Sequence, residues 1–238
     1  MFGLVEWRGA GERCGAREKR LDGVRFLAVG IRRGDGLRAV WSLRTAARTL
    51  ERYGVTQAVF PRGFSAYERF AARGIVPVDV RPLREAAAVA IARRVMAQQE
   101  IAPRRATVAL CAARVTRAYA AAAETRYLQL CTAQGGWELS QTLRSRFGVA
   151  APVLRVPEGA DIVLCFDDAA EISAARGIVL PLGAASLRVT YGGERAEKCG
   201  GEPEQLLAAW YASLALRAEE ICVKRVAWDQ SANIGVER

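Results

Sequence analysis

Polar side chains that could hold a small ligand follow three apolar runs in the middle of the chain. The runs are Thr107–Cys111, Tyr127–Cys131 and Ala160–Phe166, and their continuous apolar character is typical of strands buried in a parallel sheet. Parallel strands point the same way, so residues that follow them meet at one edge, where open α/β sheets bind ligands. The binding residues predicted at this edge are Cys111, Ala113, Arg114, Thr116, Thr132, Gln134 and Asp167.

The chemistry of this edge favours an anion. Arg114 and Thr116 stand at the start of a predicted helix, Val115–Ala123, where free N–H groups and the helix dipole attract negative charge. The edge is mildly cationic, so a small anionic ligand is the preferred prediction. Two other interpretations stay open: a solvated helix start, and an edge filled by its own side chains.

Residues 107–136 have the order of a mononucleotide-binding βαβ unit without its glycines. A dinucleotide fingerprint places Gly-x-Gly-x-x-Gly across the first turn, whereas this chain has Cys111-x-Ala113-x-x-Thr116. The added side chains occupy space where a pyrophosphate would approach the backbone. No acidic residue follows the second strand to hold a ribose, which counts against NAD. No cofactor is firmly predicted.

About a third of the chain, residues 106–191, resembles the nucleotide-binding domain of the shikimate dehydrogenase and glutamyl-tRNA reductase group. The resemblance rests on Thr107–Leu110, Arg114–Ala118 and Ala160–Leu164. It implies a Rossmann-like fold and makes NADP the cofactor to test. The catalytic lysine and aspartate of the shikimate enzymes are not found in residues 1–105, where the only lysine is Lys19, in a predicted loop.

The composition restricts the chemistry that any site can use. The chain has no histidine, so general acid–base catalysis would need carboxylates, lysine, cysteine or tyrosine. Its six cysteines are widely spaced, without a Cys-x-x-Cys pair, which predicts reduced thiols packed as small apolar residues and no metal site. These cysteines are Cys14, Cys111, Cys131, Cys165, Cys199 and Cys222.

Charge is distributed unevenly along the chain. Residues 1–155 contain 27 Lys and Arg against 12 Asp and Glu, whereas residues 156–238 contain 8 against 13. A basic part of this kind can bind nucleic acid or an acidic partner. The arginines are scattered without interleaved aromatic residues, so nucleic acid is the less favoured partner. Oligomeric state is not predicted.

Alternation of strands and helices predicts an α/β fold with a doubly wound, mostly parallel, Rossmann-like sheet. Leu4–Arg8 and Val24–Ile31 are expected to form an N-terminal β-hairpin, and Ile221–Trp228 a last strand that returns to it. The predicted domains are an N-terminal hairpin and α/β region, 1–105, and a Rossmann-like domain, 106–238, with one continuous unit as the alternative. No apolar run is long enough to span a bilayer and no signal peptide is recognised, so a cytoplasmic protein is expected.

Three functions agree with these patterns, and whether the protein is an enzyme stays open. The preferred one is a Rossmann-like ligand-binding or interaction protein with a degenerate dinucleotide fingerprint, distinct from a standard dehydrogenase. The first alternative is an NADP-dependent oxidoreductase related to shikimate dehydrogenase. The second is a basic adaptor for nucleic acid or an acidic partner.

Overall fold

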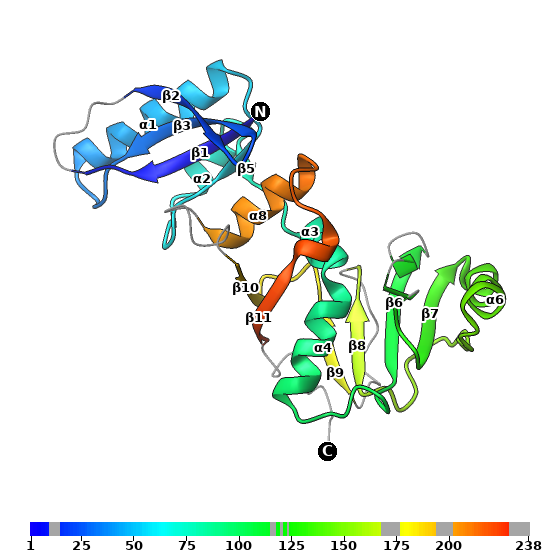
Figure 1. Cartoon of the computed structure of the whole chain (residues 1–238). Coiled ribbons are helices and arrows are strands. Elements are labelled where there is room, and N and C mark those ends of the chain that lie inside the picture. The colour runs from blue at the N-terminus through cyan, green and yellow to red at the C-terminus, as the bar shows by residue number, and fades with distance from the viewer. Residues whose placement is uncertain are drawn as a thin grey trace. The chain divides into compact units, whose positions relative to one another are not determined.

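The computed structural model divides the chain into two α/β units, each built on a sheet of its own (Figure 1). It describes residues 1–9, 15–114, 118–119, 121–122, 124–167, 177–193 and 202–228. The first unit comprises Met1–Val80 and Gly192–Glu220, and the second Arg81–Tyr191 and Ile221–Arg238. Contacts therefore divide the chain differently from the boundary expected near residue 105, because residues after 80 bond to the second unit and a late helix packs with the N-terminal strands.

The first unit contains a five-stranded sheet in the order β2-β3-β1-β4-β5. Its strands β3, β1, β4 and β5 are parallel, and β2 runs antiparallel to β3 at one edge. The proline-containing strand β5 lies at the other edge, as its sequence predicts. The bounds are β1 Phe2–Trp7, β2 Ala16–Leu21, β3 Val24–Ile31, β4 Gln57–Val59 and β5 Val76–Pro77.

The predicted N-terminal hairpin is wrong in its pairing. β1 and β3 are parallel, with Phe2 opposite Phe26 and Trp7 opposite Ile31. The hairpin forms instead between β2 and β3, through Asp22 and Gly23, whose φ angles of 45° and 86° are both positive. Asp-Gly in this conformation matches the twist of a two-residue hairpin turn. The loop expected before β3 therefore contains a strand.

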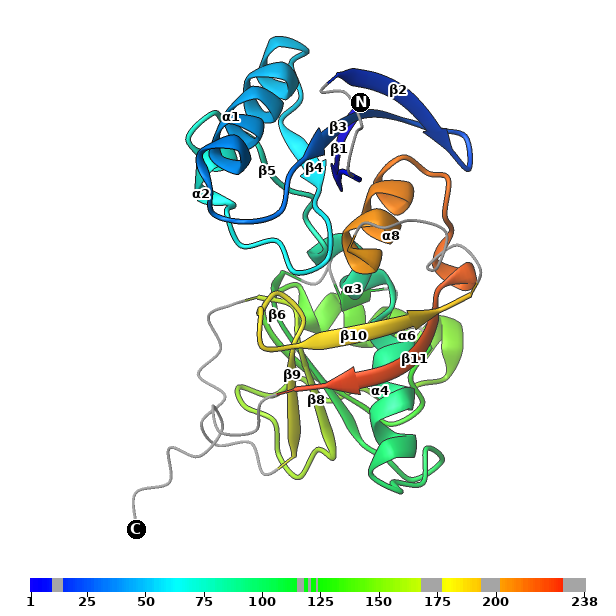
Figure 2. The same cartoon turned by 90° about the vertical axis from the view of Figure 1, so that its left-hand side faces the viewer.

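Helices cover both faces of this sheet, with α1 and α2 on one side and α8 on the other (Figure 2). The buried face of α1 joins Val5, Val29 and Phe60 in one core cluster. Side chains of the opposite parity, such as Leu4 and Phe26, are also fully buried, as expected for parallel strands covered on both faces. The bounds are α1 Leu37–Arg52, α2 Glu68–Ala71, α8 Pro203–Ala212 and the 3-10 turn η1 Ala218–Glu220.

Buried hydrogen bonds attach α8 to the first unit across a long sequence separation. The Phe60 N–H donates to Gln205 Oε1 at 2.8 Å, and the Glu202 N–H donates to the Phe60 carbonyl at 2.8 Å. Trp210 Nε1 donates to the Leu21 carbonyl at 3.1 Å. The two bonds to Phe60 satisfy its backbone groups after β4, so α8 closes that part of the sheet's carboxyl edge, and the Trp210 bond attaches α8 to β2.

The second unit contains a four-stranded parallel sheet in the order β7-β6-β8-β9. Val153 adds a parallel bridge to Leu130 outside β7, which gives the strand order of a Rossmann half, 3-2-1-4-5. The predicted adjacent, parallel and buried strands at Val108, Leu128 and Val163 are confirmed. The bounds are β6 Val108–Arg114, β7 Leu128–Gln134, β8 Ile162–Cys165 and β9 Ile178–Pro181.

The good helix formers of Leu83–Gln99 predict one long helix, but the structure interrupts it. It forms two helices, α3 Arg81–Ala86 and α4 Ala88–Gln98, joined at Ala87, where φ and ψ are −88° and 4°. In α3 the buried Arg84 donates to the carbonyls of Leu182 and Ala184 at 3.3 and 2.8 Å. This anchor fixes α3 against the segment after β9, a contact that helix propensity does not reveal. Helix α6, Gly136–Phe147, follows β7 and ends at Gly148, as predicted.

The last strand does not return to the N-terminal strands. β11, Cys222–Ala227, belongs to a two-stranded sheet with β10, Arg188–Gly192. The Gln98 side chain bonds both backbone groups of Val226, donating to its carbonyl and accepting from its N–H, each at 3.0 Å. The amide of Gln98 thereby satisfies both backbone groups of Val226 and attaches β11 to α4.

Candidate functional site

The predicted binding residues lie at the carboxyl edge of the second sheet, but within longer strands than expected. β6 continues through Arg114, so Ala113 and Arg114 belong to the strand and not to a tight turn. β7 likewise extends through Thr132 to Gln134. Asp167 follows β8 by two residues, and Thr116 lies outside the described residues.

The strand register places these residues on two faces of the sheet. Ala112 is paired with Thr132 and Arg114 with Gln134, and paired residues of parallel strands point to the same side. Cys111 and Ala113 have the opposite parity and point to the other side. The predicted residues therefore lie at the same edge of the sheet, as expected. They do not line a single crevice, because they point to both faces of the sheet.

The carboxylate of Asp167 occupies a backbone donor at this edge. Its Oδ2 accepts a hydrogen bond of 2.5 Å from the Ala113 N–H. In a dinucleotide site the backbone near this turn faces the pyrophosphate. Here a negatively charged oxygen already lies against that backbone, which disfavours a second anion at the same place.

The hydroxyl group of Thr132, in β7, is buried beside the start of α6. Thr132 Oγ1 is inaccessible to solvent and has no hydrogen-bond partner among the described residues. A Cβ at Gly136 would lie 2.4 Å from this oxygen, so glycine is required there. Gly135 precedes it in a left-handed conformation with φ of 75°, as a tight strand-to-helix turn requires.

Three cysteines form a row across the second sheet. Cys131, Cys111 and Cys165 stand opposite one another on β7, β6 and β8. A hydrogen bond from Cys131 favours the Cys111 thiolate, but the bond to Cys165 and burial outweigh it and raise the pKa of Cys111 to about 12. The hydrogen bond to Cys111 and burial also raise the pKa of Cys131. Both thiols are protonated at neutral pH and are poor nucleophiles.

The row therefore acts as apolar packing, next to Ala109, Val163 and Val179. Cys111, Cys131 and Cys165 are free thiols within strands or at their ends, as predicted. Cys222 is also free but exposed, and Cys14 and Cys199 lie outside the described residues. Within the described part of the chain, no group of three acidic, cysteine or histidine side chains is placed to hold a metal ion. None of the helices there is long and apolar enough to cross a membrane.

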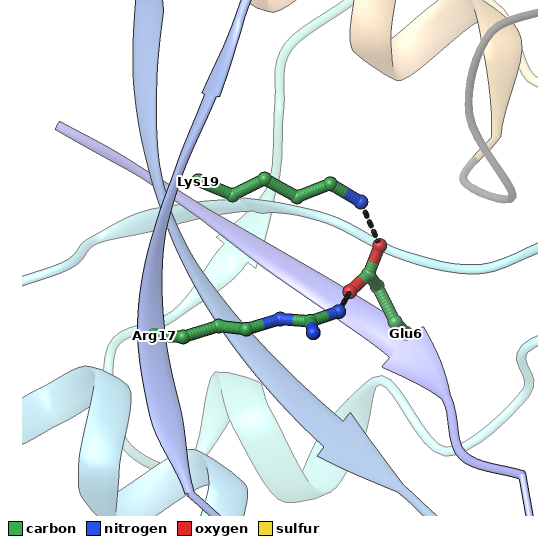
Figure 3. A network of polar contacts seen from close by, with 3 residues as sticks. All are labelled: Glu6, Arg17 and Lys19. Carbon is green, nitrogen blue, oxygen red and sulfur yellow. Dashed lines mark hydrogen bonds and ion pairs between the residues drawn. The ribbon is translucent and has the colours of Figure 1, made fainter.

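In the first unit, Lys19 lies in strand β2 and not in a loop, and it binds a carboxylate. Its Nζ is 2.7 Å from Glu6 Oε1, and Arg17 Nη2 is 3.1 Å from Glu6 Oε2 (Figure 3). β3 lies between the strands that bear these residues, and its Gly30 stands opposite Glu6 without a side chain. Burial opposes ionisation of Glu6, but the bonds from Lys19 and Arg17 outweigh it and lower its pKa below 4.5.

We expect Glu6→Gln to reduce the free energy of unfolding by about 1 kcal/mol at pH 7, because the ion pairs are partly exposed. A carboxylate with a lowered pKa stabilises the fold above its ordinary pKa, and that stabilisation is lost as the pH falls through the folded-state value. The difference in stability between the two proteins should therefore begin to shrink as the pH falls below 4.5 and should disappear below the folded-state pKa of Glu6. Urea unfolding across pH 3 to 7 measures it. Glu18→Gln, at an exposed pair 4.0 Å from Arg25, is the control and should change little; a constant Glu6→Gln effect at all pH values would contradict the assignment.

A glycine-bearing strand-to-helix turn occurs in the first unit, where no binding residues were predicted. Gly34-Asp35-Gly36 joins β3 to α1, and Gly34 has φ of 102°. Arg32, Arg33 and Arg38 flank this turn and are exposed. Three arginines within seven residues of this turn could have indicated a binding site for an anion. This signal was missed because β3 was expected to pair with β1 in an antiparallel hairpin.

Comparisons with known proteins do not assign the chain to a family. No family model and no curated protein matches it. One solved structure, of a shikimate 5-dehydrogenase-like protein, is similar over 72% of this chain and 69% of that protein, with 10% sequence identity and a TM-score of 0.26. Similarity at this level carries no argument about function. The chain is a mixed α/β protein of two units with parallel sheets flanked by helices, the second with Rossmann-like strand order.

Proposed function

We propose that this chain is a Rossmann-like ligand-binding or interaction protein and not a dehydrogenase. The bond from the Ala113 N–H to Asp167 Oδ2 carries the proposal, because it places a carboxylate where a dinucleotide would present its pyrophosphate. Continuation of β6 through Arg114 supports it, since the tight glycine turn of a dinucleotide site is replaced by extended backbone.

The protonated thiols of Cys111 and Cys131 support the same proposal. Neither offers a nucleophile at neutral pH. Of the remaining polar groups at the edge, Thr132 has a buried hydroxyl, whereas Gln134 is exposed, neutral and suited to hydrogen bonding. A small ligand held by Arg114 and Gln134, which share one face of the sheet, agrees with this chemistry.

We expect millimolar NADP, NAD or S-adenosylmethionine to raise the melting temperature of the native protein by less than about 1 °C. Dissociation constants above the ligand concentration give almost no stabilisation, and the Asp167 carboxylate keeps phosphate binding weak. Thermal unfolding with each compound measures this. Asp167→Asn removes the charge at nearly constant shape and should increase any NADP shift.

A shift of several degrees in the native protein that Arg114→Glu abolishes would instead favour the NADP-dependent oxidoreductase. Arg146→Glu, an exposed charge reversal near the end of α6, is the matched control for the change in net charge. Restoring glycine at Ala113 and Thr116 should not greatly weaken whatever NADP binding is present, because glycine is the residue of the usual fingerprint.

A further inference from the structure

The two most exposed large apolar side chains in the described part of the chain both belong to the first unit. Leu37, at the start of α1, is 90% exposed, and Leu214, just after α8, is 91% exposed. Exposed leucines of this kind are common singly, but each of these stands among charges. The charges near Leu37 are mostly positive, with Asp35 the exception, and those near Leu214 are mostly negative.

The first surface is the α1 stripe, formed by Leu37, Trp41, Arg44 and Arg48. Spacings of three and four residues place them on one side of the helix, opposite its buried side. Trp41 is 61% exposed. A shallow, open depression of about 400 Å³ on the surface of this helix is lined by Leu37, Arg38, Val40, Trp41 and Arg44.

The positive charge of the α1 stripe is not neutralised within its helix. The only acidic residue of α1 is Glu51, and it forms an ion pair with Arg73. No ion pair among the described residues involves Arg44 or Arg48. Tryptophan and arginine are the residues most enriched at binding hot spots, so the stripe has the composition of a docking surface.

The second surface is the α8 end, the short segment after α8 that contains Leu214, Glu219 and Glu220. Leu214 has φ of 58°, a left-handed conformation that usually requires glycine. The Ala215 N–H reaches back to the Trp210 carbonyl at 2.9 Å, which fixes this helix end and directs Leu214 to solvent. Glu219 and Glu220 are exposed in η1, although Glu220 also accepts from the Arg217 N–H and Arg217 adds one positive charge.

The two surfaces are complementary in chemistry, and α1 and α8 lie on opposite sides of the first sheet (Figure 2). An apolar depression rimmed by arginines matches a projecting leucine followed by glutamates. We propose that the α1 stripe docks the α8 end of a second copy of this chain, with Leu214 against Leu37 and Trp41 and with Glu219 and Glu220 near Arg44 and Arg48. Such a contact is head-to-tail, so copies add successively or close into a ring.

The contact is weak and sensitive to salt. The two surfaces are small, and each exposed ion pair contributes about 0 to 1 kcal/mol to the free energy of association. We therefore expect association only at roughly tens to hundreds of micromolar protein. At 0.1 M salt, charges more than about 10 Å apart are largely screened from one another. Higher ionic strength shortens this distance and weakens the attraction between the two surfaces further.

Sedimentation velocity of the full chain tests the proposal, from about 10 to about 500 μM protein, at low and high salt. We expect the average mass to rise with concentration at low salt. Arg44→Glu with Arg48→Glu should give a monomer, and so should Glu219→Arg with Glu220→Arg. Mixing these two double variants should restore association, because each then presents a surface opposite in charge to one on the other.

Two further variants separate a specific contact from general attraction. Leu214→Gly should stabilise the helix end, because glycine accepts the left-handed conformation, and yet weaken association at least several-fold. Arg69→Glu, an exposed reversal on α2, should leave association unchanged. If Leu214→Gly associates like the native protein, or if Arg69→Glu weakens association as strongly as the Arg44 and Arg48 reversals, the proposal is wrong.

A different occupant would give a different result. If the native chain stays monomeric at every concentration and binds a labelled polyuridine of about 20 nucleotides through Arg44 and Arg48, the stripe is a nucleic-acid surface and self-association is overturned. Failure of this proposal leaves the NADP measurements unaffected, because those depend on residues of the second unit.

Discussion

Trp210→Ala is expected to lower the free energy of unfolding of the first unit by about 3 to 5 kcal/mol, the usual cost of deleting a buried tryptophan. Trp210 is only 1% exposed, and its indole N–H donates to the Leu21 carbonyl at the start of the hairpin turn. The variant loses apolar burial from α8 and a hydrogen bond to β2 together. Urea unfolding followed by far-UV circular dichroism measures the change without relying on tryptophan fluorescence.

The matched control is Trp137→Ala, at a tryptophan that is 67% exposed in the first turn of α6. Its effect should stay within about 0.5 kcal/mol. Comparing the two variants also tests whether residues 192–220 belong to the same unit as residues 1–80. If Trp210→Ala costs no more than Trp137→Ala, α8 is not an integral part of that unit.

Gly177→Ala is expected to destabilise the second unit by at least about 3 kcal/mol, at the upper end of overpacking effects. A Cβ at Gly177 would lie 2.0 Å from the Ala160 carbonyl oxygen and 2.8 Å from that of Asp161. Both atoms belong to backbone, which cannot rotate away as a side chain can. The adjacent Ile178 N–H donates to the Asp161 carbonyl at 2.9 Å, so relief of the clash would disrupt the first bond between β8 and β9.

The comparison for this variant is Gly15→Ala, before β2, where an added Cβ meets no atom within 4 Å. That change should be neutral or slightly stabilising, because alanine reduces the freedom of the unfolded chain. Thermal unfolding and the soluble yield of both variants provide the measurement. A Gly177→Ala protein as stable as the Gly15→Ala protein would show that β8 and β9 do not approach as closely as described.

The central sheet could be predicted from the sequence because its strands are continuous apolar runs. Val108, Leu128 and Val163 stand in segments that only a sheet covered on both faces can bury, so adjacency and parallel direction followed. The helix over 136–147 was equally legible from its periodicity and the terminal glycine. Local patterns of this kind are sufficient to predict the secondary structure of the segments that contain them.

The pairing of β1 with β3 could not be predicted in the same way. β2 is a short, charged edge strand exposed on most of its length, so it shows no apolar alternation and resembles a loop. In the sequence, only the Asp22-Gly23 pair indicated a tight turn between β2 and β3. Because β2 lies between β1 and β3 along the chain, β1 and β3 are not consecutive strands. Likewise, the bonds between Gln205 and Phe60 depend on residues 145 positions apart, which no local pattern reports.

The sequence by itself determined that polar residues follow the parallel strands near Cys111, Cys131 and Cys165 and that the glycines of a dinucleotide turn are replaced. Only the tertiary structure decided which of those residues share a face, because one additional residue in a strand reverses the side to which a side chain points. It also decided that Asp167 accepts from the Ala113 N–H, since that bond depends on the distance between two strand ends. Charge spacing along α1 was present in the sequence, but burial of one side of the helix was needed to show which arginines remain exposed.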